Sequence, residues 1–345
     1  MNDKSKQRVA VWLFTGCFLI FSMVVIGGIT RLTGSGLSIT EWNVVMGTIP
    51  PLNEKEWQIA FEKYQQIPQF HKINSHFEIS DFKSIFLWEY LHRLIGRLIG
   101  IVFIIPFLWF LFTRQMDKTF IRKALFLFAL GALQGFLGWF MVKSGLTERT
   151  SVSHIRLAVH LLAAFITFGF TFWYALELVY PVGNQAFKKQ HKLLRSILGM
   201  LIIQIVYGAF VAVMHAGKIY NTWPLMDGQI IPSGIMGMSP LIQNFFDNQV
   251  LVQFLHRLFA ILIVLMILQI WLLEKKQLRS RLQKRGMNFL LLAMVFQFLL
   301  GVLTLLTQVN ITLASLHQVG AFFLFSATIF LLFHYRNQNT AATIG

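Results

Sequence analysis

Residues 89–112 read EYLHRLIGRLIGIVFIIPFLWFLF, so a glutamate, a histidine and two arginines stand at the head of a run that is otherwise apolar. A run of this length and hydropathy is typical of a helix that crosses the hydrocarbon core of a membrane, which is about 30 Å thick. The whole chain shares this character: its 345 residues are 56% hydrophobic and 13% charged, and its mean hydropathy is +0.62. This composition excludes an ordinary soluble protein and indicates an integral membrane protein.

Eight apolar stretches are each long enough to cross a membrane as a helix. They lie near residues 10–30, 86–112, 123–142, 155–180, 194–214, 250–273, 288–307 and 312–334. The sequence therefore predicts an all-α integral membrane protein with eight transmembrane helices. The single cysteine, Cys17, lies in the first stretch, so the chain has no disulfide framework and no CxxC redox pair.

The basic residues predict how the chain is oriented. The N-terminus, the tail and the loops near 113–123, 181–195 and 274–287 hold 18 of the 30 Lys and Arg residues, whereas the opposite loops hold 8. Because cytoplasmic loops carry the excess of basic residues, both termini are predicted to be cytoplasmic, with the long loops 31–85 and 215–249 outside. This distribution also accounts for the net charge of +16 without a nucleic-acid partner, and membrane lipid is the expected surroundings.

The two halves of the chain repeat each other. WEYLHRLIGRLIGI (88–101) matches VQFLHRLFAILIVL (252–265), and ALQGFLGWF (132–140) matches VFQFLLGVL (295–303). The second match aligns Gln134 with Gln297 and Gly138 with Gly301. Four helices per repeat return the chain to the same side of the membrane, so the repeats are parallel. We therefore expect two four-helix bundles, formed by residues 1–187 and 188–345.

The outer loops repeat with a different spacing. Trp42 and Pro51 precede Trp223 and Pro232 by 181 positions, whereas the two His-Arg pairs are 164 positions apart. The difference is an insertion of 17 residues in the first outer loop, around residues 60–80. The sequence does not tell whether this insertion covers a substrate site or only the surface of the protein.

Four histidines lie at the same depth in four different predicted helices. They are His92, His160, His256 and His317, each five or six residues from the outer end of its helix and two in each repeat. Ionisable residues within a membrane are costly and usually face the interior of a bundle with a partner. Two inward histidines on neighbouring helices suit the two axial positions of a haem iron.

Other interpretations of these histidines remain open from the residues alone. A histidine also serves as a hydrogen-bonding group between membrane helices. Zinc is less suited because no third or fourth ligand has a matching spacing. A di-iron carboxylate centre would explain the Glu89-x-x-His92 pattern, but Glu89 is the only carboxylate well inside the outer half of the predicted helices.

Arginines accompany these histidines. Arg93 and Arg257 directly follow His92 and His256, and Arg156 lies one turn before His160. Haem propionates are anionic and normally point toward water, so arginines near the outer surface are suited to bind them. The alternative is that these side chains extend to the membrane surface as long basic residues ordinarily do, although Arg97 lies a turn deeper.

The two repeats differ at the position of Glu89. The second repeat has Gln253 there, and it has Ile261 at the position of Arg97. A carboxylate three residues from an axial histidine projects from the same face of the helix, where it can take a proton or stabilise positive charge. Pairing with Arg93 or Arg97 is the alternative role for Glu89. The asymmetry favours one reactive half and one electron-transfer half.

The whole sequence resembles the haem A synthase family, whose members oxidise a methyl group of haem O to the formyl group of haem A. The resemblance covers nearly the whole chain, through GGITRLTGSGLSITEWNVVMGTIPPLNEKEW (27–57), EYLHRLIGR, RLAVHLL, FLHR and LASLHQ. Each short motif is weak by itself, but their order and spacing across two repeats are specific. Some members carry a cysteine pair in the first outer loop, and this chain is similar to the type that lacks it.

The resemblance implies a role for each matching residue. His256 and His317, with Arg257 beside them, would bind a resident haem b. His92, His160, Arg93 and Arg97 would border the site of haem O, and Glu89 would be the catalytic carboxylate. The implied location is the cell inner membrane, with the haem sites near the outer, periplasmic side. A haem O synthase is the expected donor of the substrate.

Two rival functions also fit parts of the pattern. A dihaem b-type electron-transfer protein would share the four histidines, but two equivalent haems would not require the difference between Glu89 and Gln253. A transporter built from parallel repeats would more often have helices broken near the membrane centre. The sequence identifies neither the electron acceptor nor the route by which haem enters, and it leaves open whether the chain is a homo-oligomer.

Overall fold

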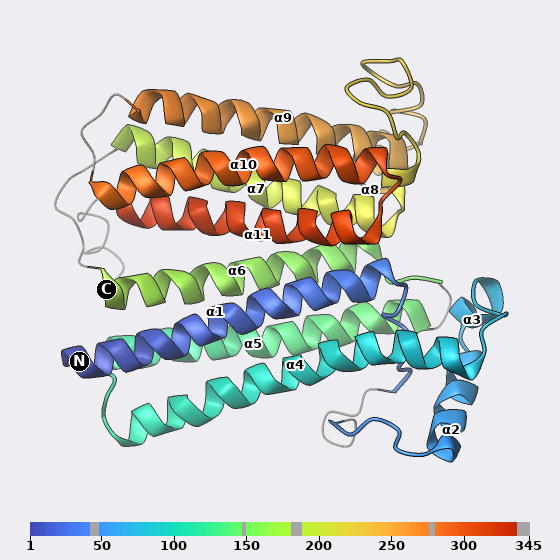
Figure 1. Cartoon of the computed structure of the whole chain (residues 1–345), viewed down its shortest axis with the longest axis horizontal. Coiled ribbons are helices and arrows are strands. Elements are labelled where there is room, and N and C mark those ends of the chain that lie inside the picture. Colours follow the sequence, from blue (N-terminus) through green and yellow to red (C-terminus); the bar gives the residue numbers. More distant parts are fainter. Residues whose placement is uncertain (42–47, 147–149, 181–187, 276–279, 337–345) are drawn as a thin grey trace. The chain divides into compact units, whose positions relative to one another are not determined.

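The computed structural model describes residues 1–41, 48–146, 150–180, 188–275 and 280–336. Eight long helices in these ranges are apolar enough to cross a membrane. They are α1 (Asp3–Leu32), α4 (Ile79–Phe112), α5 (Lys118–Leu146), α6 (His154–Val179), α7 (Lys188–Val213), α9 (Gln249–Glu274), α10 (Arg281–Leu306) and α11 (Ile311–His334) (Figure 1). The predicted all-α fold with eight membrane-length helices is confirmed. Trp42, used above to define the repeat of the outer loops, lies outside the described residues.

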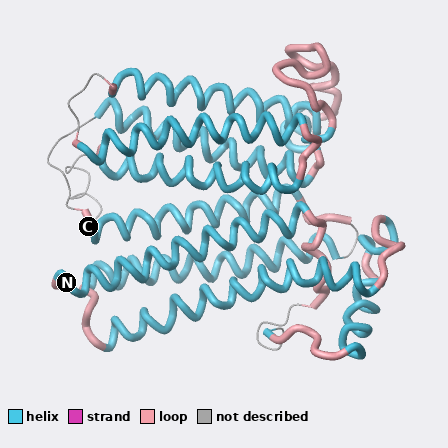
Figure 2. Tube along the Cα trace, in the orientation of Figure 1, coloured by secondary structure: helices cyan, strands magenta, loops and turns pink. Residues whose placement is uncertain are grey.

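Shorter helices lie in the two long loops. The first loop contains α2 (Glu54–Gln65) and α3 (Pro68–Lys72), and the second contains α8 (Asn244–Asp247) and two single turns of 3₁₀ helix, Ala216–Lys218 and Leu241–Gln243. Figure 2 shows helices and loops but no strand in the described part of the chain. The long loops are therefore partly helical rather than extended.

Polar side chains set the starts of several helices. Asn248, Ser280 and Asn310 each accept a hydrogen bond from a backbone N–H in the first turn of α9, α10 and α11. Helix α4 begins at Ile79, seven residues before the apolar run predicted from the sequence. Glu78 and Asp81 account for this early start, because they form a capping box in which the Glu78 N–H donates to Asp81 Oδ2 at 3.0 Å.

The described chain divides into two compact units. The N-terminal unit is Thr15–Thr167, and the C-terminal unit is Met1–Phe14 together with the chain from Phe168 onward. Helices α1 and α6 each contribute residues to both units. This division reflects spatial contacts, whereas the boundary predicted between residues 187 and 188 reflects the internal repeat; that boundary stays a prediction.

The C-terminal unit contains a four-helix bundle of α7, α9, α10 and α11 (Figure 1). Its apolar core comes from the beginning of α7 and α10 and the end of α9 and α11, with Leu194, Ile197, Ile267, Leu290 and Leu331 fully buried. The histidines of this unit lie on the opposite halves of α9 and α11. One end of the bundle is therefore closed by apolar packing, and the other end carries the polar groups.

In the N-terminal unit, the predicted insertion forms an outer cap, which we define as α2, α3 and the connection to α4. Its residues Phe61, Tyr64 and Ile67 form a buried core with Leu37 of the preceding loop and with Phe82, Ile85 and Phe86 of α4. Asn74 donates a hydrogen bond to the Tyr64 hydroxyl at 2.7 Å, and Gln69 donates to the backbone oxygen of Gly34 at 2.9 Å. Gly34 has a φ of +69°, which favours glycine. The cap is therefore a folded part of the outer loop, joined to the end of α1 and the start of α4.

We expect Phe82→Ala to loosen this cap. Phe82 is fully buried, and its ring centre lies 5.3 Å from those of Phe61 and Tyr64. Removing a buried aromatic ring from a packed core costs about 3–5 kcal/mol. Limited proteolysis of the protein in detergent should then cleave residues 54–77 much faster. Leu52→Ala is the control because Leu52 is 75% exposed; equal protease resistance of the two variants would contradict the packing described here.

Candidate functional site

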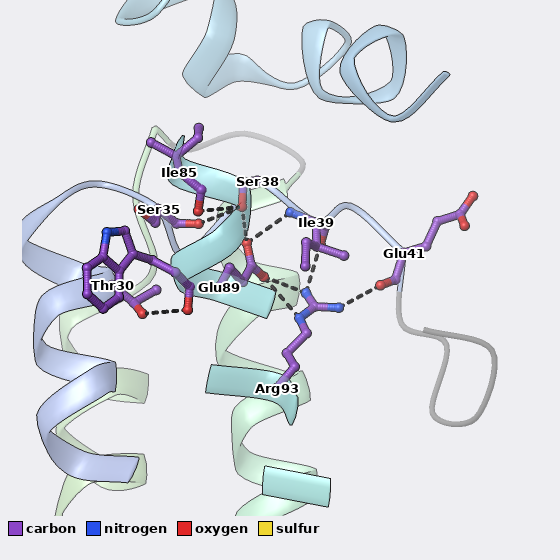
Figure 3. Close-up of polar contacts among 9 residues, drawn as sticks. Thr30, Ser35, Ser38, Ile39, Glu41, Ile85, Glu89 and Arg93 are labelled. Carbon is purple, nitrogen blue, oxygen red and sulfur yellow. Dashed lines mark hydrogen bonds and ion pairs between the residues drawn. The ribbon is translucent and has the colours of Figure 1, made fainter. Parts of the chain in front are cut away.

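The carboxylate of Glu89 is the centre of a polar network in the N-terminal third of α4 (Figure 3). Glu89 is only 3% exposed. Its Oε2 accepts hydrogen bonds from the Ser38 hydroxyl at 2.8 Å and from the backbone N–H of Ile39 at 2.9 Å. Its Oε1 accepts from Arg93 Nε at 3.1 Å and Nη2 at 2.6 Å. Four donors therefore fix the orientation of one buried carboxylate.

The segment that follows α1 supplies half of these donors. Ser38 is 2% exposed and also lies within hydrogen-bond distance of the backbone oxygen of Ser35, at 2.9 Å. The Thr30 hydroxyl lies 3.2 Å from the backbone oxygen of Trp88, next to Glu89 (Figure 3). The end of α1 and the loop after it are thus joined to α4 at the position of the carboxylate.

The Arg93 guanidinium also binds the backbone of this loop. Its Nη1 donates to the backbone oxygen of Glu41 at 2.7 Å, and its Nη2 donates to that of Ile39 at 2.8 Å (Figure 3). Arg93 therefore pairs with Glu89, as one interpretation of the sequence expected, and holds the outer loop at the same time. The predicted contact of Arg93 with a propionate stays a prediction.

Arg257 makes the equivalent contacts in the C-terminal unit. Its Nη1 donates to the backbone oxygen of Thr222 at 2.9 Å, and its Nη2 donates to that of Tyr220 at 2.7 Å. Thr222 and Tyr220 follow Glu41 and Ile39 by 181 positions, which is the offset of the outer-loop repeat. The same arginine–loop contact thus occurs in both units, down to the nitrogen atoms used.

The two units differ at the position of the Glu89 carboxylate. Gln253 replaces Glu89, is 2% exposed, and donates to the backbone oxygen of Tyr220 at 3.0 Å. The residue 181 positions after Ser38 is Ile219, which has no hydroxyl. The carboxylate and its serine donor are therefore lost together. Ser38 was not among the residues expected from the sequence, although the offset of 181 pairs it with Ile219.

The four predicted histidines form one pair in each unit. His92 on α4 and His160 on α6 lie close enough to interact electrostatically, and so do His256 on α9 and His317 on α11. All four side chains are half-buried. The structure thus brings together the residues that the sequence placed at one depth.

A glycine on a neighbouring helix lies against each histidine ring. A Cβ atom added to Gly27, Gly138, Gly208 or Gly301 would lie 2.8, 3.4, 3.2 or 2.8 Å from the Cε1 atom of His92, His160, His256 or His317, respectively. At the shorter distances a methyl group would displace the ring. Gly27 and Gly208 are separated by 181 positions, and this pair was also missed from the sequence.

In the C-terminal unit a hydrogen bond orients the ring of His317, whereas His256 is bound through its backbone oxygen. His317 Nδ1 lies 3.2 Å from the backbone oxygen of Gln297, and Gln204 donates to the backbone oxygen of His256 at 3.0 Å. In the tautomer that carries its proton on Nδ1, His317 donates to Gln297 and keeps the Nε2 lone pair for a metal. Among the described residues, Nδ1 of His92, His160 and His256 is buried without a hydrogen-bond partner.

The number of available protein ligands distinguishes a haem from a zinc or di-iron site. The described residues contain no group of three or more His, Cys, Asp or Glu side chains that could hold a metal ion. Structural zinc and di-iron carboxylate centres need at least that many protein ligands. A haem iron needs two, because the porphyrin supplies the other four. Paired histidines therefore fit a haem better than a metal ion bound by protein alone.

Two further arginines lie near the histidines of the N-terminal unit. Arg97 is half-buried on α4, one turn beyond Arg93. Arg156 Nη1 donates to the backbone oxygen of Phe140 at 2.8 Å, and its guanidinium lies 3.8 Å from the centre of the Phe140 ring. Arg156 is therefore bound to α5.

These features define a multi-pass α-helical membrane protein with a pair of histidines in each of its two units and a buried carboxylate beside one pair. Comparison with known families then gives a specific assignment. Residues 10–329 match the family described as cytochrome oxidase assembly protein, and the chain belongs to this family.

Curated relatives carry a more specific name. A "Heme A synthase" of Flavobacterium johnsoniae is 48% identical over 334 residues, which cover 95% of this chain and 98% of the relative. A "Heme A synthase" of Nitrosomonas eutropha is 43% identical over 339 residues, covering 96% and 95%. One of Wolbachia pipientis is 41% identical over 344 residues, covering 97% and 95%. The family predicted from the sequence motifs is confirmed.

We expect Arg257→Gln to release the second outer loop. Two hydrogen bonds from a charged donor would be lost, and each contributes about 1.5–3 kcal/mol. Amide hydrogen exchange in residues 217–224 should become at least about tenfold faster. Lys218→Gln is the control, because the Lys218 side chain is exposed in the same loop. Unchanged exchange in the Arg257 variant would show that these contacts do not hold the loop.

Proposed function

We propose that the chain is a haem A synthase that oxidises a methyl group of haem O to a formyl group in its N-terminal unit. The observation that carries this proposal is the buried Glu89 carboxylate, held by four donors three residues from His92 and replaced by Gln253 in the other unit. Helical neighbours at this spacing lie on one face, so the carboxylate and the histidine belong to one site. The names of the relatives support the same reaction.

In this proposal, His256 and His317 hold a resident haem b in the C-terminal unit. The paired rings, the close glycines and the hydrogen bond at His317 Nδ1 support a fit for two axial ligands. When bound, this haem would supply one-electron transfer. The backbone oxygen of Gln297 fixes the ring of His317. Arg257 holds the second outer loop through its hydrogen bonds to Tyr220 and Thr222.

His92 and His160 would bind the iron of the substrate, haem O, and so place the macrocycle beside Glu89. The fixed carboxylate would stabilise positive charge that develops at the methyl carbon before water adds. Ser38 and the Ile39 N–H keep the carboxylate in place for this role. Two successive two-electron oxidations give the alcohol and then the gem-diol, which loses water to form the aldehyde; the four electrons and protons leave to an acceptor that no motif identifies.

The proposal includes a location and partners. Both termini lie in the cytoplasm, so the paired histidines lie near the outer side of the cell inner membrane. A haem O synthase supplies the substrate. The N-terminal repeat (1–187) carries the haem O site, and the C-terminal repeat (188–345) carries the haem b site. Arg93 and Arg97 border haem O; the oligomeric state is left open.

The alternative function, a dihaem b-type electron-transfer protein, has less support. Two equivalent relay haems would require neither a buried carboxylate nor its serine donor in one unit only. A transporter is also less suited, because the membrane-length helices are continuous and α4 continues through Pro106. None of the relatives named above is described as a transporter or an electron-transfer protein.

The reaction itself is tested by supplying haem O. Cells that make haem O and express this chain should contain haem A or its hydroxylated intermediate, detected by mass analysis of extracted haems. Cells without the chain are the control. Folded protein accompanied only by haem B and unchanged haem O would overturn the proposed reaction.

Glu89→Gln should lower product formation by about 100- to 1,000-fold, the usual effect of removing one group that stabilises a transition state. The variant copies the C-terminal unit, where Gln253 is accommodated at the same position. The spectrum of the haem bound in that unit should stay unchanged, which shows that the protein is folded. Glu177→Gln, on the opposite half of α6, is the matched control and should keep full activity. Full activity of the Glu89 variant would exclude the catalytic role.

Gly301→Ala tests whether His317 is an axial ligand. The new methyl group would lie 2.8 Å from His317 Cε1 and push the ring away from its position. We expect the variant to lose the low-spin spectrum of a haem with two histidine ligands. Gly199→Ala, where the added Cβ meets nothing within 4 Å, is the control. An unchanged spectrum in the Gly301 variant would contradict ligation by His317 in this geometry.

A further inference from the structure

Arg31 is a half-buried arginine in the last turn of α1, within the N-terminal unit. Among the residues that the structure describes, none forms a hydrogen bond or ion pair with its guanidinium. Charged side chains at membrane depth are costly and usually mark a binding site when protein does not pair them. Arg31 has no assigned role in the motifs or in the network around Glu89.

The end of α1 does not need Arg31 as a cap. Basic side chains in the last turn of a helix often bind its free carbonyl groups. Here the backbone N–H groups of Thr33, Ser35 and Gly34 already donate to the oxygens of Ile29, Thr30 and Arg31 at 2.9, 2.8 and 3.2 Å. The guanidinium is therefore available for another anion.

The position of Arg31 points to the paired histidines. Arg31 follows Gly27 by four residues, so both lie on the same face of α1, about 6 Å apart along the helix axis. Gly27 is the residue that lies against the His92 ring. Arg31 is thus one turn closer to the outer end of α1 than the point where this helix contacts His92.

The neighbouring arginines have other partners. Arg93 binds Glu89 and two loop carbonyl groups, and Arg156 binds the backbone of Phe140. The position equivalent to Arg31 in the C-terminal unit, 181 residues later, is Ala212. This cation therefore belongs to the same half of the chain as Glu89 and Ser38.

We propose that Arg31 binds a propionate carboxylate of the tetrapyrrole substrate in the N-terminal unit. A guanidinium pairs with a carboxylate through two parallel hydrogen bonds, which fixes direction as well as distance. With the iron on His92 and His160, a second fixed point at a propionate sets the rotation of the macrocycle and hence which methyl group faces Glu89. This inference rests on the proposed function and adds a recognition site for the carboxylate.

The test compares haem O with its dimethyl ester, in which both propionates are neutral. Each is titrated by absorbance into purified protein that retains the haem of the C-terminal unit. Arg31→Gln should weaken haem O binding about 10- to 100-fold, as expected for the loss of a charged hydrogen-bonded pair. The affinity for the ester should be the same in the variant and the parent protein. Arg31→Lys should restore part of the loss, because it keeps the charge without the planar fork.

Arg122→Gln, an exposed arginine at the start of α5 with no assigned role, is the matched control and should not change the ratio of the two affinities. An equal loss of haem O and ester binding in Arg31→Gln would indicate a structural role and overturn the inference. Equal affinity of the parent protein for haem O and its ester would overturn it as well. If the parent protein binds haem O but forms no haem A, the proposed reaction fails, and the affinity ratio still decides the role of Arg31.

Discussion

A carboxylate buried within a membrane protein must be paired and hydrogen-bonded, and this requirement organises the N-terminal unit where α1 ends beside α4. Glu89 receives two of its donors from a loop about 50 residues earlier in the chain and two from Arg93 on its own helix. Arg93 also binds two backbone oxygens of this loop, and Thr30 joins the end of α1 to α4 at the backbone oxygen of Trp88. The carboxylate, the arginine and the loop are thus bound to one another, and the loss of any one removes hydrogen bonds from the other two.

The internal repeat shows how a shared framework is adapted to a different role. Both units join the outer loop to a helix through an arginine that binds two backbone oxygens, and both place a glycine against each histidine ring. The two units differ at the carboxylate, where Ser38 and Glu89 are replaced by Ile219 and Gln253. An amide keeps a similar shape without the charge, so the second unit loses the carboxylate without leaving a buried ion. We infer that the framework positions a macrocycle in both units and that these substitutions make one unit reactive.

The large apolar clusters lie at different places in the two units. In the C-terminal unit, large aliphatic side chains fill one half of the four-helix bundle, and the histidines occupy the other half. In the N-terminal unit, the aromatic outer cap covers the start of α4 instead. The 17 inserted residues are therefore part of a packed core, which the sequence could not establish because α2 has a mixed polar and apolar composition. Its partners, such as Phe82 and Leu37, come from other parts of the chain.

The sequence by itself determined the number of membrane-length helices, the four helices that carry the histidines and the family. These properties depend on local hydropathy, on spacing along a helix and on motif order, all of which can be read from the chain. Only the tertiary structure decided that Arg93 and Arg257 bind loop carbonyl groups, that Ser38 and the Ile39 N–H hold Glu89, and that a glycine lies against each ring. The physical reason is that backbone carbonyl and N–H groups are present at nearly every residue and leave no mark in a sequence. Which of them meets a given side chain depends on how distant segments pack.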